Sequence, residues 1–314
     1  MRRLVLSALS LVLVASCSSD RAPNAAGTPA PPATLAASAV PTERATPSGA
    51  ARQGVLVTVG VSIDVLDPDT GRLLRTLQRT PEDAVDTRVK ISDDGASTYV
   101  LREFGGFAAC GRAQVLSVAT AGGPVRPLVE EPTPISDFAV SPDRKTVAYE
   151  RTDCGTGPNE LVLLDLASGR ERLLDRPDKG QGLAFSPDST RLVAAGEIVD
   201  LSAQDPFTAG VPLEPEDAFD PRFRSSDGQL VVTLFAEDQA IVVALDVATG
   251  RQVGARRVIT ATAGSLVSDP EGVRYVGLDF PDEGDDYLSG TLVEIRGGQA
   301  VPLGDIQAID VAWG

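Results

Sequence analysis

The sequence contains no histidine at all. Without it the chain cannot form a Ser-His-Asp triad, a Cys-His nucleophile pair or a zinc site that includes an imidazole ligand. It also lacks a phosphate loop of the form G-x-x-x-x-G-K, a nucleophile elbow G-x-S-x-G and a dinucleotide-binding fingerprint. We therefore assign no catalytic residue from a motif, and we expect no cofactor.

Basic residues are scarce as well, at 28 Lys and Arg against 44 Asp and Glu, which gives a net charge of −16 at pH 7. Nucleic-acid binding takes clustered positive charge, and no basic run occurs here, so we expect no nucleic-acid partner. Aromatic residues make up only 4% of the chain, whereas glycine (30) and proline (23) are plentiful. That composition is typical of many short strands joined by tight turns.

No apolar run is long enough to cross a bilayer, which takes about 18 residues or more. Arg2 and Arg3 precede the short apolar stretch 4–15, as in a secretory signal peptide. The residues "VASC" (14–17) resemble the bacterial lipobox, in which the cysteine is acylated and becomes the mature N-terminus. The resemblance implies a lipoprotein signal peptide over 1–16 and a lipid on Cys17. The alternative is an ordinary signal peptide with an incidental cysteine.

Residues 17–51 are rich in Ala, Pro, Thr and Ser and have little to bury. Such a segment cannot offset its own ordering entropy, so we expect a disordered tether. It would hold a folded head clear of the lipid bilayer, on the extracytoplasmic face of the cell membrane.

The rest of the chain repeats two phrases. The first is a short apolar strand, a turn of Ser, Pro, Asp and Gly, and a second strand; it occurs at 90–103, 139–150, 184–196, 222–236 and 266–279. The second is a hairpin with a T-G or S-G turn, at 65–77, 163–175 and 244–256, with looser copies at 117–129, 199–213 and 293–303. Together they make a unit of four antiparallel strands, which is the signature of a β-propeller blade.

The second phrase occurs six times and the first only five. The chain ends on "DIQAIDVAWG" (305–314), an apolar strand with no turn after it. Placed before the strand that begins near Val55, this segment completes a sixth first phrase, and it should bury Ile306, Ile309, Val311 and Trp313. The sequence therefore predicts an all-β, six-bladed β-propeller over 52–314, closed by the C-terminal strand joining the N-terminal blade.

Within these predicted blades, the phrases "FSPDS…RLVAAG" and "LDLASGR" resemble those of TolB-like, WD-repeat-like propellers of bacterial envelopes. The resemblance covers residues 52–314. The shared residues form turns, so they are specific for the fold but hardly for function. In that family the propeller is typically a binding platform rather than an enzyme, and the resemblance implies the same role here.

Three blades have an enlarged loop between their second and third strands, at 104–112, 152–160 and 280–290. Elaborated loops on one face of a rigid scaffold are a common way to acquire a partner; drift of surface loops is the alternative. The candidate partner-face residues are Phe104, Phe107, Asn159 and Tyr287. Cys110 and Cys154 lie in two of these loops on neighbouring blades, and outside the cytoplasm we expect them to form a disulfide rather than remain free thiols.

The loop 279–287 also carries Asp282, Asp285 and Asp286, which could ligate calcium through oxygen. The spacing lacks the D-x-D-x-D-G pattern, and in so acidic a chain a charged loop is usually just solvated. We therefore assign no metal site.

Three hypotheses follow for function. The first is a membrane-anchored platform that binds an envelope protein or a cell-wall component without catalysis. The second is a hydrolase or lactonase that uses paired carboxylates in the central channel. The third is a sensor of a small ligand in that channel. Carboxylates clustered at the channel mouth would favour the enzyme, whereas aromatic or apolar residues on the loops would favour a partner.

Overall fold

The computed structural model describes the chain from residue 54 to its end at 314, apart from short gaps. The described residues are 54–105, 111–152, 159–174, 182–208, 210–214, 219–224, 227–236, 239–259, 263–269, 274–280, 289–297 and 299–314. The predicted signal peptide and tether lie outside these residues. Within them, no helix is long and apolar enough to span a membrane.

The described strands form six antiparallel sheets of four strands each, which we number as blades one to six. Blade one contains β24 (Asp310–Trp313), β1 (Leu56–Val59), β2 (Ser62–Leu66) and β3 (Leu73–Arg79). Blade two contains β4 (Ala84–Ile91), β5 (Ser97–Phe104), β6 (Ala113–Ala119) and β7 (Arg126–Glu131). Blade three contains β8 (Ile135–Val140), β9 (Thr146–Arg151), β10 (Glu160–Asp165) and β11 (Arg170–Leu174).

The second half of the chain builds the other three blades. Blade four contains β12 (Ala184–Phe185), β13 (Arg191–Ala194), β14 (Glu197–Asp200) and β15 (Val211–Pro212). Blade five contains β16 (Phe219–Phe223), β17 (Leu230–Ala236), β18 (Gln239–Leu245) and β19 (Gln252–Ile259). Blade six contains β20 (Ala263–Ser268), β21 (Tyr275–Asp279), β22 (Gly290–Arg296) and β23 (Gln299–Ala308).

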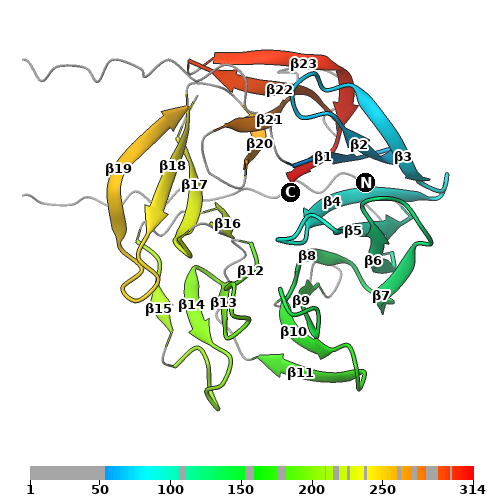
Figure 1. The fold of residues 1–314 in the computed structure, drawn as a ribbon. Helices are drawn as coiled ribbons and strands as arrows, with labels where there is room; N and C mark the ends of the chain where they lie inside the picture. Colours follow the sequence, from blue (N-terminus) through cyan, green and yellow to red (C-terminus); the bar gives the residue numbers. More distant parts are fainter. Residues whose placement is uncertain are drawn as a thin grey trace, which may run out of the picture. The chain divides into compact units, whose positions relative to one another are not determined.

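The blades stand in a ring, with the first strand of each blade at the centre and the fourth at the rim (Figure 1). We call the central strands β24, β4, β8, β12, β16 and β20 the inner strands. The six-bladed propeller predicted from the sequence is confirmed.

The ring closes within blade one, as predicted. Strand β24 pairs with β1 in antiparallel register, with Leu56 opposite Trp313 and Thr58 opposite Val311. The closing strand is shorter than the segment 305–314, because β23 continues to Ala308 and stays paired with β22. Ile306 therefore belongs to blade six and is half-buried, as is Ile309 between the two strands, while Val311 and Trp313 are buried.

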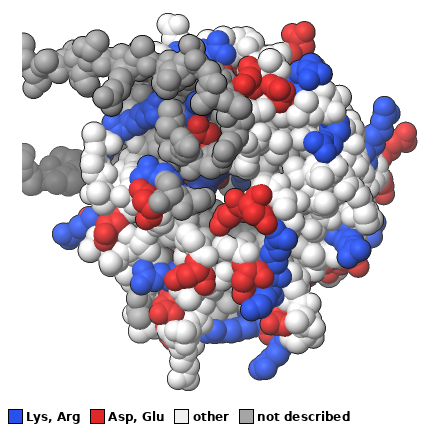
Figure 2. Space-filling view, viewed as in Figure 1, with Lys and Arg blue, Asp and Glu red and all other residues white. Residues whose placement is uncertain are grey.

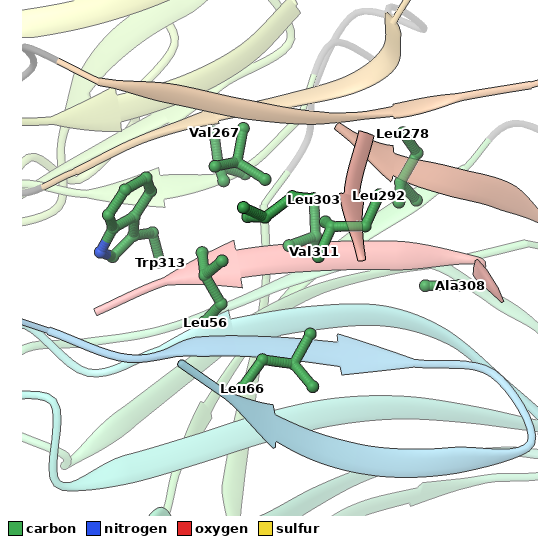
Figure 3. Packing of buried hydrophobic residues seen from close by; sticks show 10 residues of the cluster. Leu56, Leu66, Val267, Leu278, Leu292, Leu303, Ala308, Val311 and Trp313 are labelled. Atoms are coloured by element: carbon green, nitrogen blue, oxygen red, sulfur yellow. The ribbon is translucent and has the colours of Figure 1, made fainter. Parts of the chain in front are cut away.

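The hydrophobic core lies between neighbouring blades. Each of the six clusters of buried apolar side chains draws its members from two adjacent blades. In the cluster at the closure, Leu56, Val311 and Trp313 of blade one pack with Val267 and Leu303 of blade six (Figure 3). Each inter-blade interface thus depends on the blades on both sides of it, and the interface at the closure depends on both ends of the folded head.

Turn residues have the roles that the repeated phrases predict. In the first phrase, the Ser141 hydroxyl accepts hydrogen bonds from the backbone N–H groups of Lys145 and Thr146. In the second, Asp67 Oδ1 accepts from the N–H of Asp69 and the N–H and hydroxyl of Thr70. These local bonds fix the hairpins that separate the strands.

Glycine in the second phrase has a packing role only at some blades. Gly71 has φ 64°, and a Cβ there would lie 2.1 Å from the carbonyl oxygen of Leu303 in blade six. Gly169, with φ 67°, occupies the equivalent turn of blade three and has open space around it. We expect Gly71→Ala to lower the free energy of unfolding by about 1–3 kcal/mol more than Gly169→Ala, since only the first adds a clash to the backbone strain. Urea denaturation checks this, and equal losses would contradict it.

The turn aspartates should also make stability depend on pH. Hydrogen bonds from Ser186 and Thr190 lower the pKa of Asp188 to about 2, from an ordinary value of 3.8. Its stabilising effect is therefore complete above pH 3.8 and disappears as the pH falls towards 2. We expect Asp188→Ala to lower the urea midpoint at pH 7, with the difference from wild type shrinking near pH 2. A difference that stays constant with pH would contradict the assignment.

Candidate functional site

The propeller has two faces, because successive strands of a blade run in opposite directions. One face carries the connections between the second and third strands of each blade: 60–61, 105–112, 152–159, 195–196, 237–238 and 280–289. We call it the loop face. The opposite face carries the hairpins of the two repeated phrases, and we call it the turn face.

The three enlarged loops fall on the loop face, as predicted. In blades two, three and six the second and third strands are separated by the segments 105–112, 152–159 and 280–289. In blades one, four and five the same connection is two residues long, for example Gly60 and Val61 in blade one. Half of the blades therefore have an elaborated connection on the same face of the ring.

Two of the four candidate partner-face residues can be placed. Phe104 is the last residue of β5 and is half-buried, with the Arg112 guanidinium carbon 3.9 Å from the centre of its ring. Asn159 is half-buried and directly precedes β10. Phe104 thus supports the base of its loop beneath an exposed arginine.

The other predicted site residues lie outside the described residues: Cys17, Phe107, Cys110, Cys154, Asp282, Asp285, Asp286 and Tyr287. The lipidation, the disulfide and the calcium alternative stay untested predictions. Among the residues that the structure describes, no group of three or more acidic or cysteine side chains is placed to hold a metal ion.

A network of hydrogen bonds joins blades two and three near two of the enlarged loops. The Tyr149 hydroxyl donates to Glu131 Oε1 at 2.6 Å, and Glu171 Oε1 lies 3.2 Å away. Arg151, at the end of β9, pairs with Glu160 at 2.7 Å and with Glu131 at 3.5 Å. Burial and the two carboxylates raise the pKa of the Tyr149 hydroxyl, so it stays protonated and acts as a donor. The network holds the loop-face ends of β7, β9 and β10 together.

One position in or just before the inner strand recurs in all six blades around the central axis. Just after each inner strand, a backbone N–H group donates a hydrogen bond to a backbone carbonyl at the start of the next strand. We call the donor residue the anchor; the six anchors are Ser92, Ser141, Ser186, Arg224, Asp269 and Gly314. Four residues before each anchor lies what we call the ring position. In order from blade one it is occupied by Asp310, Arg88, Asp137, Gly182, Asp220 and Ser265.

Two ring-position carboxylates link successive blades. Asp310 Oδ2 accepts a hydrogen bond of 2.8 Å from the N–H of Val89 in blade two, and Asp137 Oδ2 accepts one of 2.7 Å from the N–H of Leu183 in blade four. Lys90 Nζ lies 3.3 Å from Asp137 and donates to the carbonyl of Leu183 at 2.9 Å. These carboxylates therefore hold the inner strands together.

Arg88 differs from its neighbours in the ring. The surrounding protein opposes its charge, but four nearby carboxylates, those of Asp310, Asp137, Asp220 and Glu103, outweigh that effect and raise its pKa. The residue is nevertheless accessible to solvent, and within the described part of the chain it makes no hydrogen bond or ion pair shorter than 4.0 Å. Acidic and basic side chains gather near the middle of the ring on the face shown in Figure 2. The ring position thus carries charges of both signs.

Sequence reasoning did not identify this ring of charges. The signal was present, because "DFAV", "DPRF" and "DVAW" all begin with the ring-position aspartate. It could be read only after the copies had been aligned on the anchoring hydrogen bond, since Arg88, Gly182 and Ser265 break the pattern.

No family model matches the chain, and no curated protein matches it by sequence. Among solved structures, TolB from Acinetobacter baumannii is similar with a TM-score of 0.59 and 13% identity, over 83% of this chain and 66% of that one. A chain of a nidogen/laminin complex is similar with a TM-score of 0.53 and 12% identity, over 83% of this chain and 97% of that one. At such low identity these likenesses concern the fold alone. The chain has the TolB-like, six-bladed β-propeller fold.

Proposed function

We propose that this protein is a lipid-anchored, extracytoplasmic lipoprotein whose propeller is a non-catalytic platform for an envelope protein or a cell-wall component. The observation that carries the proposal is the position of the loop face relative to the start of the described head. Val55 donates its N–H to the carbonyl of Gly314, so both residues lie at the turn-face ends of β1 and β24. The described head therefore begins on the turn face, opposite the three enlarged connections.

The contacts of the ring-position carboxylates favour binding over hydrolysis. A carboxylate that exchanges protons with a substrate must be free to do so. Instead, Asp310 and Asp137 accept backbone N–H groups, and Asp220 is bonded by Arg222 at 2.9 Å. These bonds give the three carboxylates structural roles, so the hydrolase or lactonase alternative has no separate support.

Anchoring is tested by removing the acylated residue. We expect Cys17→Ala to abolish retention in the membrane fraction, because a folded head with an acidic surface has no other stable attachment. Ser19→Ala is the matched control and should be retained in the membrane fraction. Unchanged membrane retention of the cysteine variant would contradict the anchor.

Partner binding is tested by crosslinking from each face in intact cells. A photoreactive residue at exposed Arg112 reports on the loop face, and one at exposed Ala167 reports on the turn face. We expect a discrete adduct from position 112 that is absent from position 167. Identical adducts from both positions, or none from position 112, would contradict the platform.

A further inference from the structure

The outer strand of blade five is basic in an otherwise acidic chain. No Asp or Glu occurs in residues 247–268, although the whole chain has 44 of them in 314 residues. Arg251, Arg256 and Arg257 lie in or directly before β19, and every residue of 251–258 is exposed. The strand stands at the rim of the ring (Figure 1). This part of the rim therefore attracts anionic groups.

Strand β19 is also the least protected of the six outer edges that the structure describes. A strand at the end of a sheet has backbone N–H and C=O groups that no neighbour uses, and proteins block such an edge with proline or charge, or keep it short. Strands β7, β15 and β23 contain Pro127, Pro212 and Pro302, and β11 has five residues including Glu171. Strand β3 has seven residues, and its pairing with β2 shifts register twice. Strand β19 has eight residues, one register shift and neither proline nor carboxylate.

The register shift of β19 forms a bulge at residues 254–256, opposite Val243 of β18. Gln252 Nε2 donates to the carbonyl of Gly254 at 2.9 Å, and Arg256 Nε donates to Gln252 Oε1 at 2.9 Å. No other hydrogen bond or ion pair joins Arg256 to the described residues. A bulge can redirect a side chain, and here it leaves the terminal N–H groups of a guanidinium available to a carboxylate.

Exposed valines beside the arginines favour a polypeptide over a compact anion. Val253 and Val258 are 41% and 50% exposed, and they are two of six large apolar side chains so exposed in the described part of the chain. A small anion would leave both valines in water. An extended segment with aliphatic side chains would cover them while its backbone pairs with the open edge.

We propose that the open edge of β19 binds an extended, acidic segment of a partner protein by strand addition. The carboxylates of the segment bind Arg251 and Arg256, and its aliphatic side chains cover Val253 and Val258. Arg251 is available because its only ion pair among the described residues, with Glu214 at 3.5 Å, joins two exposed groups and contributes little. The β19 edge of a second copy does not fit, because it would bring arginine against arginine.

Fluorescence anisotropy of the full chain with a labelled peptide of alternating Glu and Val, matched in length to β19, tests the proposal. We expect saturable binding that Arg251→Glu/Arg256→Glu weakens by about tenfold or more, because each substitution turns an attraction into a repulsion. Arg79→Glu/Arg126→Glu is the matched control, since it changes the net charge equally at exposed positions of β3 and β7 and should bind as wild type does. Both variants should keep the wild-type melting temperature, because all four arginines are exposed.

N-methylated peptides test the strand addition itself. Methyl groups on alternate amides remove the donors along one edge of an extended peptide, and the complementary set removes those along the other edge. One of the two peptides should lose binding and the other should keep it. No binding of the unmodified peptide, the same behaviour of both methylated peptides, or an equal loss in the control variant would overturn the proposal.

Two further measurements exclude other occupants. Vesicles of phosphatidylglycerol that bind through Arg251 and Arg256 and displace the peptide would overturn the proposal in favour of a lipid surface. A wild-type dimer in size-exclusion chromatography that Arg251→Glu/Arg256→Glu converts to a monomer would overturn it in favour of a second copy. Crosslinking from position 112 does not depend on β19, so this proposal and the loop-face platform fail separately.

Discussion

Deleting residues 310–314 should leave a chain that does not maintain a closed ring. The deletion removes β24 and with it Val311, Ala312 and Trp313, all buried at 8% exposure or less. Burial of each larger apolar side chain contributes about 1.5–3 kcal/mol, and a domain as a whole is stable by only about 5–15 kcal/mol. The loss also exposes the open edge of β1 and removes the acceptor of the Val89 N–H. We expect a product that melts far below wild type or aggregates, as measured by thermal unfolding and size-exclusion chromatography.

Two point variants calibrate this result. Trp313→Ala should cost about 3–5 kcal/mol, because it leaves a cavity at the closure between blades one and six. Val61→Ala is the control, because Val61 lies in the same blade and is 88% exposed, so it should change stability by less than about 0.5 kcal/mol. A truncated protein that elutes as a monomer at the wild-type melting temperature would show that β24 does not close the ring.

Arg102→Met should be strongly destabilising, by about 3–5 kcal/mol, since it leaves a buried carboxylate unpaired. The Arg102 guanidinium donates to both oxygens of Asp86, at 2.7 and 2.9 Å, and the two side chains are 5% and 0% exposed. Thr80, which follows β3 of blade one, donates to Asp86 at 2.7 Å. The pair therefore fastens blade two to blade one, as urea denaturation of the variant should show.

The double variant Asp86→Leu/Arg102→Met distinguishes a buried charge from lost packing. Replacing both members of a buried ion pair with apolar side chains is often neutral or stabilising. We expect the double variant to recover most of the stability lost in Arg102→Met, which would give a large coupling free energy in the double-mutant cycle. A double variant as unstable as the single one would mean that packing of the Arg102 side chain dominates.

The repeats allowed the fold to be predicted almost completely. Their turns depend on local chemistry, such as Asp67 with Thr70, that a sequence displays directly. The exact start of the closing strand could not be predicted. Residues 305–314 alternate as a single strand would, and only the pairing of β23 with β22 as far as Ala308 shows where one strand ends and the next begins.

The candidate site was predicted only in part. Loop lengths are visible in the sequence, so the elaborated face was found from spacing alone. The ring of Asp310, Arg88, Asp137 and Asp220 was not, because its members are far apart in the chain and meet only through the symmetry of the blades. Asp310 and Arg88 in particular become neighbours only when the C-terminal strand joins blade one.

The most direct test of the central claim is to shorten one enlarged loop and measure stability and partner capture in the same variant. Residues 281–288 of blade six, between the described ends at Phe280 and Ser289, can be replaced by a short Gly-Ser link. If the ring is the scaffold and the loop face the platform, the melting temperature will stay near wild type while the adduct crosslinked from position 112 is lost or greatly reduced. A wild-type yield of that adduct, with the fold intact, would contradict the account.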